Sequence, residues 1–205
     1  AKAITRTGAV TSTDQSIYYG SSGFFDRTGD YISTTNSSSD FTFGTDSFTV
    51  EGWFKYDTKD TYGPGLFQLS NAGGGSGTYD GGIYVAHASS NRIYVNIGND
   101  ITGYTPNDSY PEIDGVWHHV AVVGDSGSNV RVYIDGINQP LSGGSGSGSY
   151  DIDTAAYVTI GKYYSNSNYE FGGYIQDFRV YKGVAKYQPE GSGSLGMDVV
   201  TWTGN

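Results

Sequence analysis

The sequence predicts an all-β fold, a two-sheet antiparallel β-sandwich of the jelly-roll type. Apolar residues recur with a period near two in many short segments, which is the spacing of strands. Gly, Asn and Pro interrupt every longer window, so no helix of ordinary length can be drawn. Turn residues separate the segments at short intervals, which favours an antiparallel sandwich over alternating strands and helices. A closed barrel is the alternative.

The composition fits one large β domain and argues against several classes of partner. The chain has 205 residues, of which 32 are Gly and 19 are Tyr. Its net charge of -10 argues against binding nucleic acid or an anionic membrane surface, since both require a Lys/Arg surface. There is no cysteine, so disulfides and thiolate metal sites are excluded. No apolar run is long enough to span a bilayer, so we expect no membrane insertion.

Strands are expected at ten places along the chain. They are residues 17–25, 30–34, 48–56, 66–69, 82–86, 92–97, 117–123, 130–134, 157–161 and 174–181. Asp135 and Gly136 predict a type I′ hairpin turn, because both central positions of that turn need a positive φ. Segment 48–56 carries bulk on both faces, which is typical of an inner strand. We expect Trp53 and Trp117 to anchor the core, since each lies within an expected strand beside β-branched or aromatic neighbours.

The chain divides into three parts. Residues 1–15 are Thr-rich and form an N-terminal arm or an edge strand, and residues 16–187 form the jelly roll. Residues 188–205 read as a Gly/Ser-rich linker followed by a strand-like tail, which is the start of a further module or a strand that pairs with a neighbouring subunit. Because an unpaired strand edge invites pairing with another chain, we expect a homo-oligomer or a larger assembly.

Five short motifs occur in a fixed order. They are F-T-V-E-G-W-F (48–54), W-H-H-V-A-V (117–122), V-Y-I-D-G (132–136), T-I-G (159–161) and I-x-D-F-R-V-Y (175–181). This order resembles the laminin-G-like branch of the concanavalin A-like superfamily, over residues 16–187. The segment D-F-R-V-Y-K-G-V-A-K-Y (177–187) resembles modules of bacteriophage tail-fibre and virion structural proteins. The resemblance implies a jelly roll with a binding or structural role, located on a virion or otherwise outside the cell.

Three aspartates are candidate calcium ligands. Asp26 and Asp30 lie in one turn, and Asp177 lies on the last strand, which in this topology returns close to the first. Ca²⁺ prefers carboxylate and carbonyl oxygens. The resemblance implies a structural cation near these positions in some members of the family. The alternative is that the three are turn-forming, hydrogen-bonded aspartates.

Catalytic residues are not expected. Hydrolases of the superfamily carry paired carboxylates in the pattern E-x-D-x-x-E, and none of the four glutamates begins it. Glu51 is expected to be neutralised by Lys55 on the same strand face. His118 and His119 are adjacent on a strand and point to opposite faces, so they cannot chelate one zinc ion unless the backbone bulges there. The chain is therefore predicted not to be an enzyme, and a polysaccharide-active hydrolase ranks third among its functions.

Glycan binding is predicted from Tyr and Asn residues in loops, because aromatic rings stack on sugars while amides and carboxylates bind their hydroxyls. The candidate residues are Tyr62, Tyr79, Asp80, Tyr104, Tyr163, Tyr164, Asn166, Asn168 and Tyr169. Alternatively, Tyr simply coats the sandwich surface. The predicted function is a noncatalytic adhesion module that recognises a cell-surface glycan weakly and multivalently. The runner-up is a structural module that contacts only other virion or fibre subunits.

Overall fold

The structure is a computed structural model of the chain. It describes residues 3–34, 38–57, 63–71, 81–98, 100–110, 115–143, 149–153, 155–162 and 169–187. Within these residues no helix is long and apolar enough to cross a membrane.

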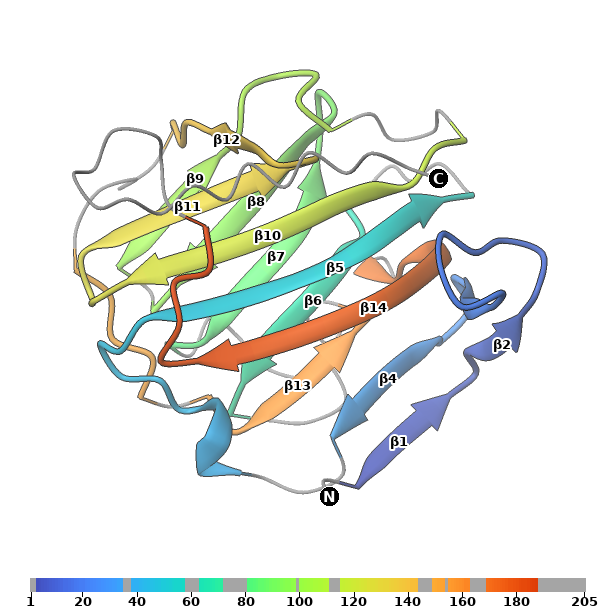
Figure 1. The fold of residues 1–205 in the computed structure, drawn as a ribbon, viewed down its shortest axis with the longest axis horizontal. Coiled ribbons are helices and arrows are strands. Elements are labelled where there is room, and N and C mark those ends of the chain that lie inside the picture. The colour runs from blue at the N-terminus through green and yellow to red at the C-terminus, as the bar shows by residue number, and fades with distance from the viewer. Residues whose placement is uncertain are drawn as a thin grey trace.

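The described residues form two antiparallel sheets of seven strands each. The first sheet has the order β1 (Ile4–Thr7), β4 (Tyr31–Thr34), β13 (Tyr157–Ile160), β6 (Gly65–Ser70), β7 (Ile83–Ala88), β8 (Arg92–Ile97) and β9 (Ile101–Tyr104). The second has the order β12 (Ile137–Gln139), β11 (Asn129–Ile134), β10 (His118–Asp125), β5 (Phe48–Tyr56), β14 (Gly172–Lys182), β3 (Ser22–Asp26) and β2 (Val10–Ser12). Figure 1 shows the second sheet in front of the first. The predicted jelly-roll sandwich is thereby confirmed.

The core lies between the two sheets, and strand β5 shows how the sequence builds it. Phe48, Val50 and Phe54 occupy alternate positions, point toward the first sheet and have no exposed surface. Phe54 stacks on Phe67 of β6 with ring centroids 6.4 Å apart, which joins the two sheets. The side chains between them, including that of Trp53, face outward. The alternation therefore gives β5 one apolar face toward the core and one outer face that carries Thr49, Glu51, Trp53 and Lys55.

The prediction that Trp53 and Trp117 anchor the core is wrong. Both side chains are half-buried, and neither belongs to the buried cluster between the sheets. Trp53 shares its strand face with polar side chains, and Trp117 lies just before β10 with its ring 6.5 Å from that of Tyr174. The large side chains on both faces of β5 thus indicate an outer face that is partly covered, and not a second layer of the core.

The hairpin prediction is confirmed. Asp135 and Gly136 have φ values of 52° and 80°, as a type I′ turn requires, and they join β11 to β12. Two local predictions are wrong: residues 17–21 form a loop and not a strand, and β9 lies where a loop was expected. In the N-terminal part, β1 and β2 are outer strands of the two sheets.

Strand β14 contains a bulge that shapes the outer face of the second sheet. Its pairing with β5 shifts between Gln176 and Arg179, so Asp177 and Phe178 together take the place of one residue. Asp177 has a left-handed φ of 54°. Phe178 packs against Phe67 in the core, and Asp177 is thereby placed on the outer face with Arg179.

Candidate functional site: a cavity on the outer face of the second sheet

Strand register places three rows of side chains across the outer face of the second sheet. Each row contains one residue from β10, one from β5 and one from β14. In order, the rows are His119, Trp53 and Gln176; Ala121, Glu51 and Arg179; and Val123, Thr49 and Tyr181. Trp53 and Glu51 therefore lie at the centre of this face, although the pattern of β5 alone does not show which neighbours they have.

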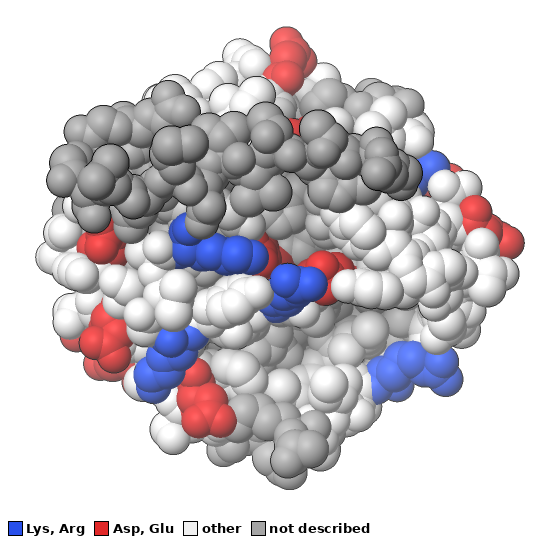
Figure 2. Space-filling model, viewed as in Figure 1, with Lys and Arg blue, Asp and Glu red and all other residues white. Residues whose placement is uncertain are grey.

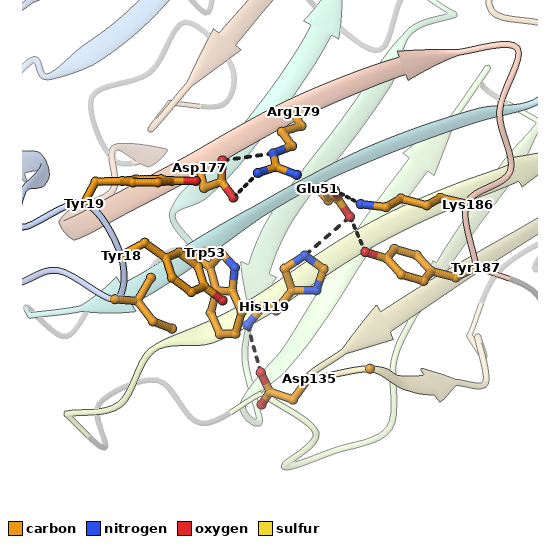
Figure 3. Close-up of a pocket in the computed structure, with 12 residues that line it drawn as sticks. Tyr18, Tyr19, Glu51, Trp53, His119, Asp135, Asp177, Arg179, Lys186 and Tyr187 are labelled. Carbon is orange, nitrogen blue, oxygen red and sulfur yellow. Dashed lines mark hydrogen bonds and ion pairs between the residues drawn. The ribbon is translucent and has the colours of Figure 1, made fainter. Parts of the chain in front are cut away.

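Two segments cover parts of this face and leave a cavity between them. One is the loop of residues 16–21, which we call the aromatic loop, and the other is residues 183–187, which we call the strap. The cavity has a volume of about 610 Å³. Its lining residues are Ile17, Tyr18, Tyr19, Glu51, Trp53, His119, Asp135, Gly136, Asp177, Arg179, Lys186 and Tyr187. Figure 2 shows Lys and Arg side chains next to Asp and Glu side chains at the centre of this face, and Figure 3 shows the lining residues.

One buried side chain holds the aromatic loop in place. The Gln176 amide is 6% exposed, and its Oε1 atom accepts hydrogen bonds of 2.9 Å from the backbone N–H groups of Ile17 and Tyr18. Its Nε2 group donates to the Ser16 hydroxyl at 3.1 Å and also to the carbonyls of Tyr18 and Ser21. This single side chain thus satisfies backbone groups along the whole loop. As a result, Tyr18 lies beside Trp53 with ring centroids 5.8 Å apart.

The strap is fixed to β5 from the opposite side of the cavity. The Thr49 hydroxyl donates to the Val184 carbonyl at 2.8 Å and accepts from the Lys186 N–H at 3.0 Å. Lys186 Nζ lies 2.6 Å from one oxygen of Glu51, and the Tyr187 hydroxyl donates to the other oxygen at 2.5 Å. Both functional side chains of the strap therefore converge on one buried carboxylate.

The environment of Glu51 keeps this carboxylate ionised. Burial alone would raise its pKa, but hydrogen bonds from His119, Lys186 and Tyr187 outweigh burial and lower the pKa to about 2. Burial and the bond to Glu51 raise the pKa of Tyr187 to about 12, so its hydroxyl stays protonated and donates. The predicted partner Lys55 is not involved, since its Nζ donates to Gln15 instead. Glu51 is indeed neutralised, but by the strap.

The other two carboxylates of the cavity also have partners and keep some exposure. Asp177 forms a two-pronged pair with Arg179, with distances of 2.9 Å to Nε and 2.7 Å to Nη2. Asp135 accepts from the His119 backbone N–H at 2.8 Å and lies 2.7 Å from Nδ1 of His118. Asp135 and Arg179 each leave 43% of the side chain exposed, so both can bind a ligand at the rim.

Most of the predicted glycan-binding residues lie outside the described part of the chain: Tyr62, Tyr79, Asp80, Tyr163, Tyr164, Asn166 and Asn168. The two that are described lie on the outer face of the first sheet. Tyr104 has its ring 5.1 Å from that of Tyr94 on β8, and Tyr169 packs against Tyr84 on β7. Neither lines the cavity. The signal that could have found the cavity is a Trp on the polar face of β5, between Glu51 and Lys55.

The structure brings together two of the three predicted calcium ligands. Asp30 accepts from the backbone N–H of Asp26 at 2.8 Å, and burial raises its pKa, as does the nearby charge of Asp26. Asp177 lies apart from them, because Asp26 pairs with Gly172, five residues earlier on β14, and Asp177 itself binds Arg179. Among the described residues there is no group of three or more His, Cys, Asp or Glu that could hold a metal ion.

The comparison with protein families identifies the class. A laminin G model of the concanavalin A-like lectin/glucanases superfamily matches residues 26–187. The chain therefore belongs to this superfamily, as the order of its motifs predicted. No curated protein matches the sequence.

Solved structures share the fold at low sequence identity. Domain 4 of AbnA, an extracellular GH43 arabinanase from Geobacillus stearothermophilus solved with arabinotriose, has a TM-score of 0.57 at 18% identity, covering 88% of this chain and 81% of that one. The binding domain of Paraclostridial Mosquitocidal Protein 1 has a TM-score of 0.60 at 14% identity, covering 88% and 44%. Domains LG4-5 of the mouse laminin alpha1 chain have a TM-score of 0.52 at 16% identity, covering 77% and 40%. The chain spans less than half the length of the last two.

Proposed function

We propose that this protein is a noncatalytic glycan-binding module and that the cavity on the outer face of the second sheet is its binding site. The observation that carries the proposal is the half-buried Trp53 on the floor, with Tyr18 beside it and the exposed polar groups of Asp135 and Arg179 at the rim. Aromatic faces pack on the C–H faces of sugar rings, and charged planar groups bind the hydroxyls.

Backbone conformation supports a functional role for this cavity. Tyr19 and Asp177 both line it with left-handed φ values of 41° and 54°, which non-glycine residues adopt at an energetic cost. Tyr19 is also 76% exposed, which is unusual for a large aromatic side chain. Strained residues gather at binding sites because the surrounding structure holds them there.

The electrostatics support binding without turnover. A glycosidase needs one carboxyl group with a raised pKa as the acid and a second carboxylate as nucleophile or base. In the cavity the pKa of Glu51 is lowered to about 2, so this group cannot deliver a proton near neutral pH. Asp177 and Asp135 are each held by a cationic or N–H partner. Glu51, the most buried carboxylate of the cavity, is therefore unsuited to act as a general acid.

One similar solved structure supports a saccharide as the ligand, and one sequence motif supports a location on a virion or outside the cell. AbnA domain 4 was solved with arabinotriose, so arabino-oligosaccharides belong among the first ligands to be tried. We further propose that the module acts on a virion or outside the cell, where several copies in one assembly convert weak single sites into firm attachment. The motif at residues 177–187 supports the setting of a tail fibre or other virion protein.

A structural protein–protein module is the second candidate. All four residues of the outer strand β1 are exposed, and Ile4 is 68% exposed. An exposed outer strand of a sheet is a place where a strand of another subunit can be added. In that case the protein assembles but binds no glycan.

The test is a glycan-binding screen of the purified protein, with arabinotriose and other plant, microbial and animal oligosaccharides, followed by calorimetry. We expect millimolar to micromolar affinity for at least one ligand and no turnover of it. Asp177→Asn combined with Arg179→Gln should weaken binding at least tenfold. Asp153→Asn, an exposed change elsewhere, is the control. Binding that is unaffected by the double change would place the ligand at another site.

A further inference from the structure

The cavity contains a continuous row of rings. Along it, neighbouring centroids are separated by 5.8 Å (Tyr19–Tyr18), 5.8 Å (Tyr18–Trp53), 5.1 Å (Trp53–His119) and 6.2 Å (His119–Tyr187). Figure 3 shows these rings side by side across the site, from the aromatic loop to the strap. The row crosses the strands and contains five rings.

Polar groups accompany the row on both sides. Figure 3 shows Asp177, Arg179, Glu51 and Lys186 along one side and Asp135 on the other. Exposure differs among these groups. Arg179 and Asp135 leave 43% of their side chains accessible, whereas Glu51 leaves 4% because the strap covers it. The accessible polar groups thus lie on opposite sides of the ring row, with Arg179 paired to Asp177 and Asp135 bonded to the His119 N–H, and Glu51 serves to position the strap.

From this arrangement we infer that the site takes several consecutive residues of an unbranched glycan chain, which runs along the row from Tyr19 toward Tyr187. This inference rests on the proposed function and names its ligand class. Neighbouring rings are inclined to one another by 53°, 79°, 52° and 78°, so consecutive sugars of a twisting chain meet ring faces and ring edges in turn. The hydroxyls on the two edges of the chain meet Arg179 and Asp135. A branch at either edge would meet these side chains, so the chain must be unbranched where it lies in the site.

Tyr19 and Trp53 then have different roles. Trp53 lies in the middle of the row and contacts any bound sugar, whereas Tyr19 lies at its open end and is 76% exposed. Loss of the Tyr19 ring should therefore affect only ligands long enough to reach it. The dependence of this loss of affinity on ligand length distinguishes a row of several sugar-binding subsites from a pocket that holds a single sugar.

The experiment measures binding of xylo-, cello- and malto-oligosaccharides of one to six residues by calorimetry, with the full chain. We expect the affinity for the recognised series to rise at least tenfold between the monosaccharide and the tetrasaccharide and then to level off. The variant Tyr19→Asn removes the ring but keeps a residue that tolerates positive φ. It should lower the affinity for the hexasaccharide about tenfold and leave the affinity for the monosaccharide unchanged.

The matched control is Tyr104→Asn on the first sheet, which should bind every length like the unaltered protein. A monosaccharide that binds as tightly as the hexasaccharide would overturn the inference and leave the proposed function intact. The same holds if Tyr19→Asn weakens ligands of all lengths equally. Failure of every oligosaccharide in this series and in the glycan screen would instead remove the proposed function, and this inference with it.

Discussion

Among single residues, Trp53 is one whose loss should affect ligand binding more than it affects folding. Its side chain is half-buried on the outer face, whereas Phe54, its neighbour in sequence, is fully buried between the sheets. We expect Trp53→Ala to abolish glycan binding at a cost of about 2 kcal/mol in unfolding free energy. Phe54→Ala should cost about 3–5 kcal/mol. Urea unfolding and calorimetry on both variants check this, and equal losses of stability would show that Trp53 belongs to the core after all.

The Glu51 cluster makes stability depend on pH. Because the folded pKa of about 2 lies below the unfolded value of 4.5, the stabilisation is fully present above pH 4.5 and is lost as the pH falls toward 2. Glu51→Gln should remove this dependence and cost about 1–3 kcal/mol at pH 7, since Lys186 and Tyr187 lose their acceptor charge. Melting curves between pH 2 and pH 7 test it, with Asp153→Asn as control. An unchanged acid limb in Glu51→Gln would refute the assignment.

The hydrogen bond between Tyr187 and Glu51 also predicts a second loss of stability, at alkaline pH. The folded pKa of Tyr187 is about 12, above the ordinary value of 10, so its contribution is present below pH 10 and is lost as the pH rises toward 12. Tyr187→Phe removes the ionisable hydroxyl and should flatten the alkaline limb while the acid limb persists. Ultraviolet titration of tyrosinate absorbance, compared between the two proteins, reports the late-ionising group directly. A difference spectrum without a component near pH 12 would contradict the proposed hydrogen bond.

The surroundings of Glu51 and Trp53 could be predicted from the sequence only in part. Glu51 was expected to be neutralised, and it is, but its partner lies 135 positions away in the strap and not four positions along β5. The outward position of Trp53 follows from strand alternation with Glu51 and Lys55 once the apolar face of β5 is assigned. Its ring neighbours Tyr18 and His119 come from other segments, and no local pattern brings them together.

At the scale of elements, the aromatic loop depends on one glutamine. Gln176 binds backbone groups of residues 16–21 with both ends of its amide. Gln176→Leu should raise the hydrogen-exchange rates of the Ile17 and Tyr18 amides at least tenfold and weaken glycan binding, because Tyr18 and Tyr19 are no longer held beside Trp53. Gln176→Glu keeps the acceptor for these two amides and should protect them better than Gln176→Leu does. Equal protection in all three proteins would mean that other contacts order the loop.

Secondary-structure elements could be predicted where a few neighbouring residues in the sequence determine them. The Asp135–Gly136 hairpin follows from two residues whose backbone preference fits one turn type. Strand β9 was missed because Ile101–Tyr104 sits among Gly, Asn and Pro, which are typical of loops. The bulge at Asp177 was not predictable, since it appears only in the pairing of β14 with β5, where Phe178 packs against Phe67 of the opposite sheet.

At the scale of the whole molecule, the sandwich followed from the period of the strands, while the site depends on how distant segments meet across it. The outer face of the second sheet carries a cavity only because the aromatic loop and the strap cover its two sides. These contacts join residues more than 130 positions apart. Neither the period of the strands nor the composition shows which distant segments meet. The sequence therefore indicated tyrosines in loops as glycan-binding residues and not the residues of this cavity.

Calcium binding remains a prediction for the assembled fold, now concerning Asp26 and Asp30. Burial and the nearby charge of Asp26 raise the pKa of Asp30, and a cation bound there would favour its ionised form. Added Ca²⁺ should then raise the melting temperature, and a chelator should lower it. Asp26→Asn should abolish this response, while Asp177→Asn should keep it, since Asp177 binds Arg179. Identical melting curves with calcium and with chelator would exclude a stabilising ion.

Binding of a glycan on the outer face of the second sheet can be observed by an NMR titration of the labelled protein with a recognised oligosaccharide. We expect the largest shifts at the amides of Tyr18, Tyr19, Trp53 and His119 and at the Trp53 indole N–H. Tyr104 and Asp26 should not respond. Shifts centred on Tyr104 and the outer face of the first sheet, with Trp53 unaffected, would contradict it.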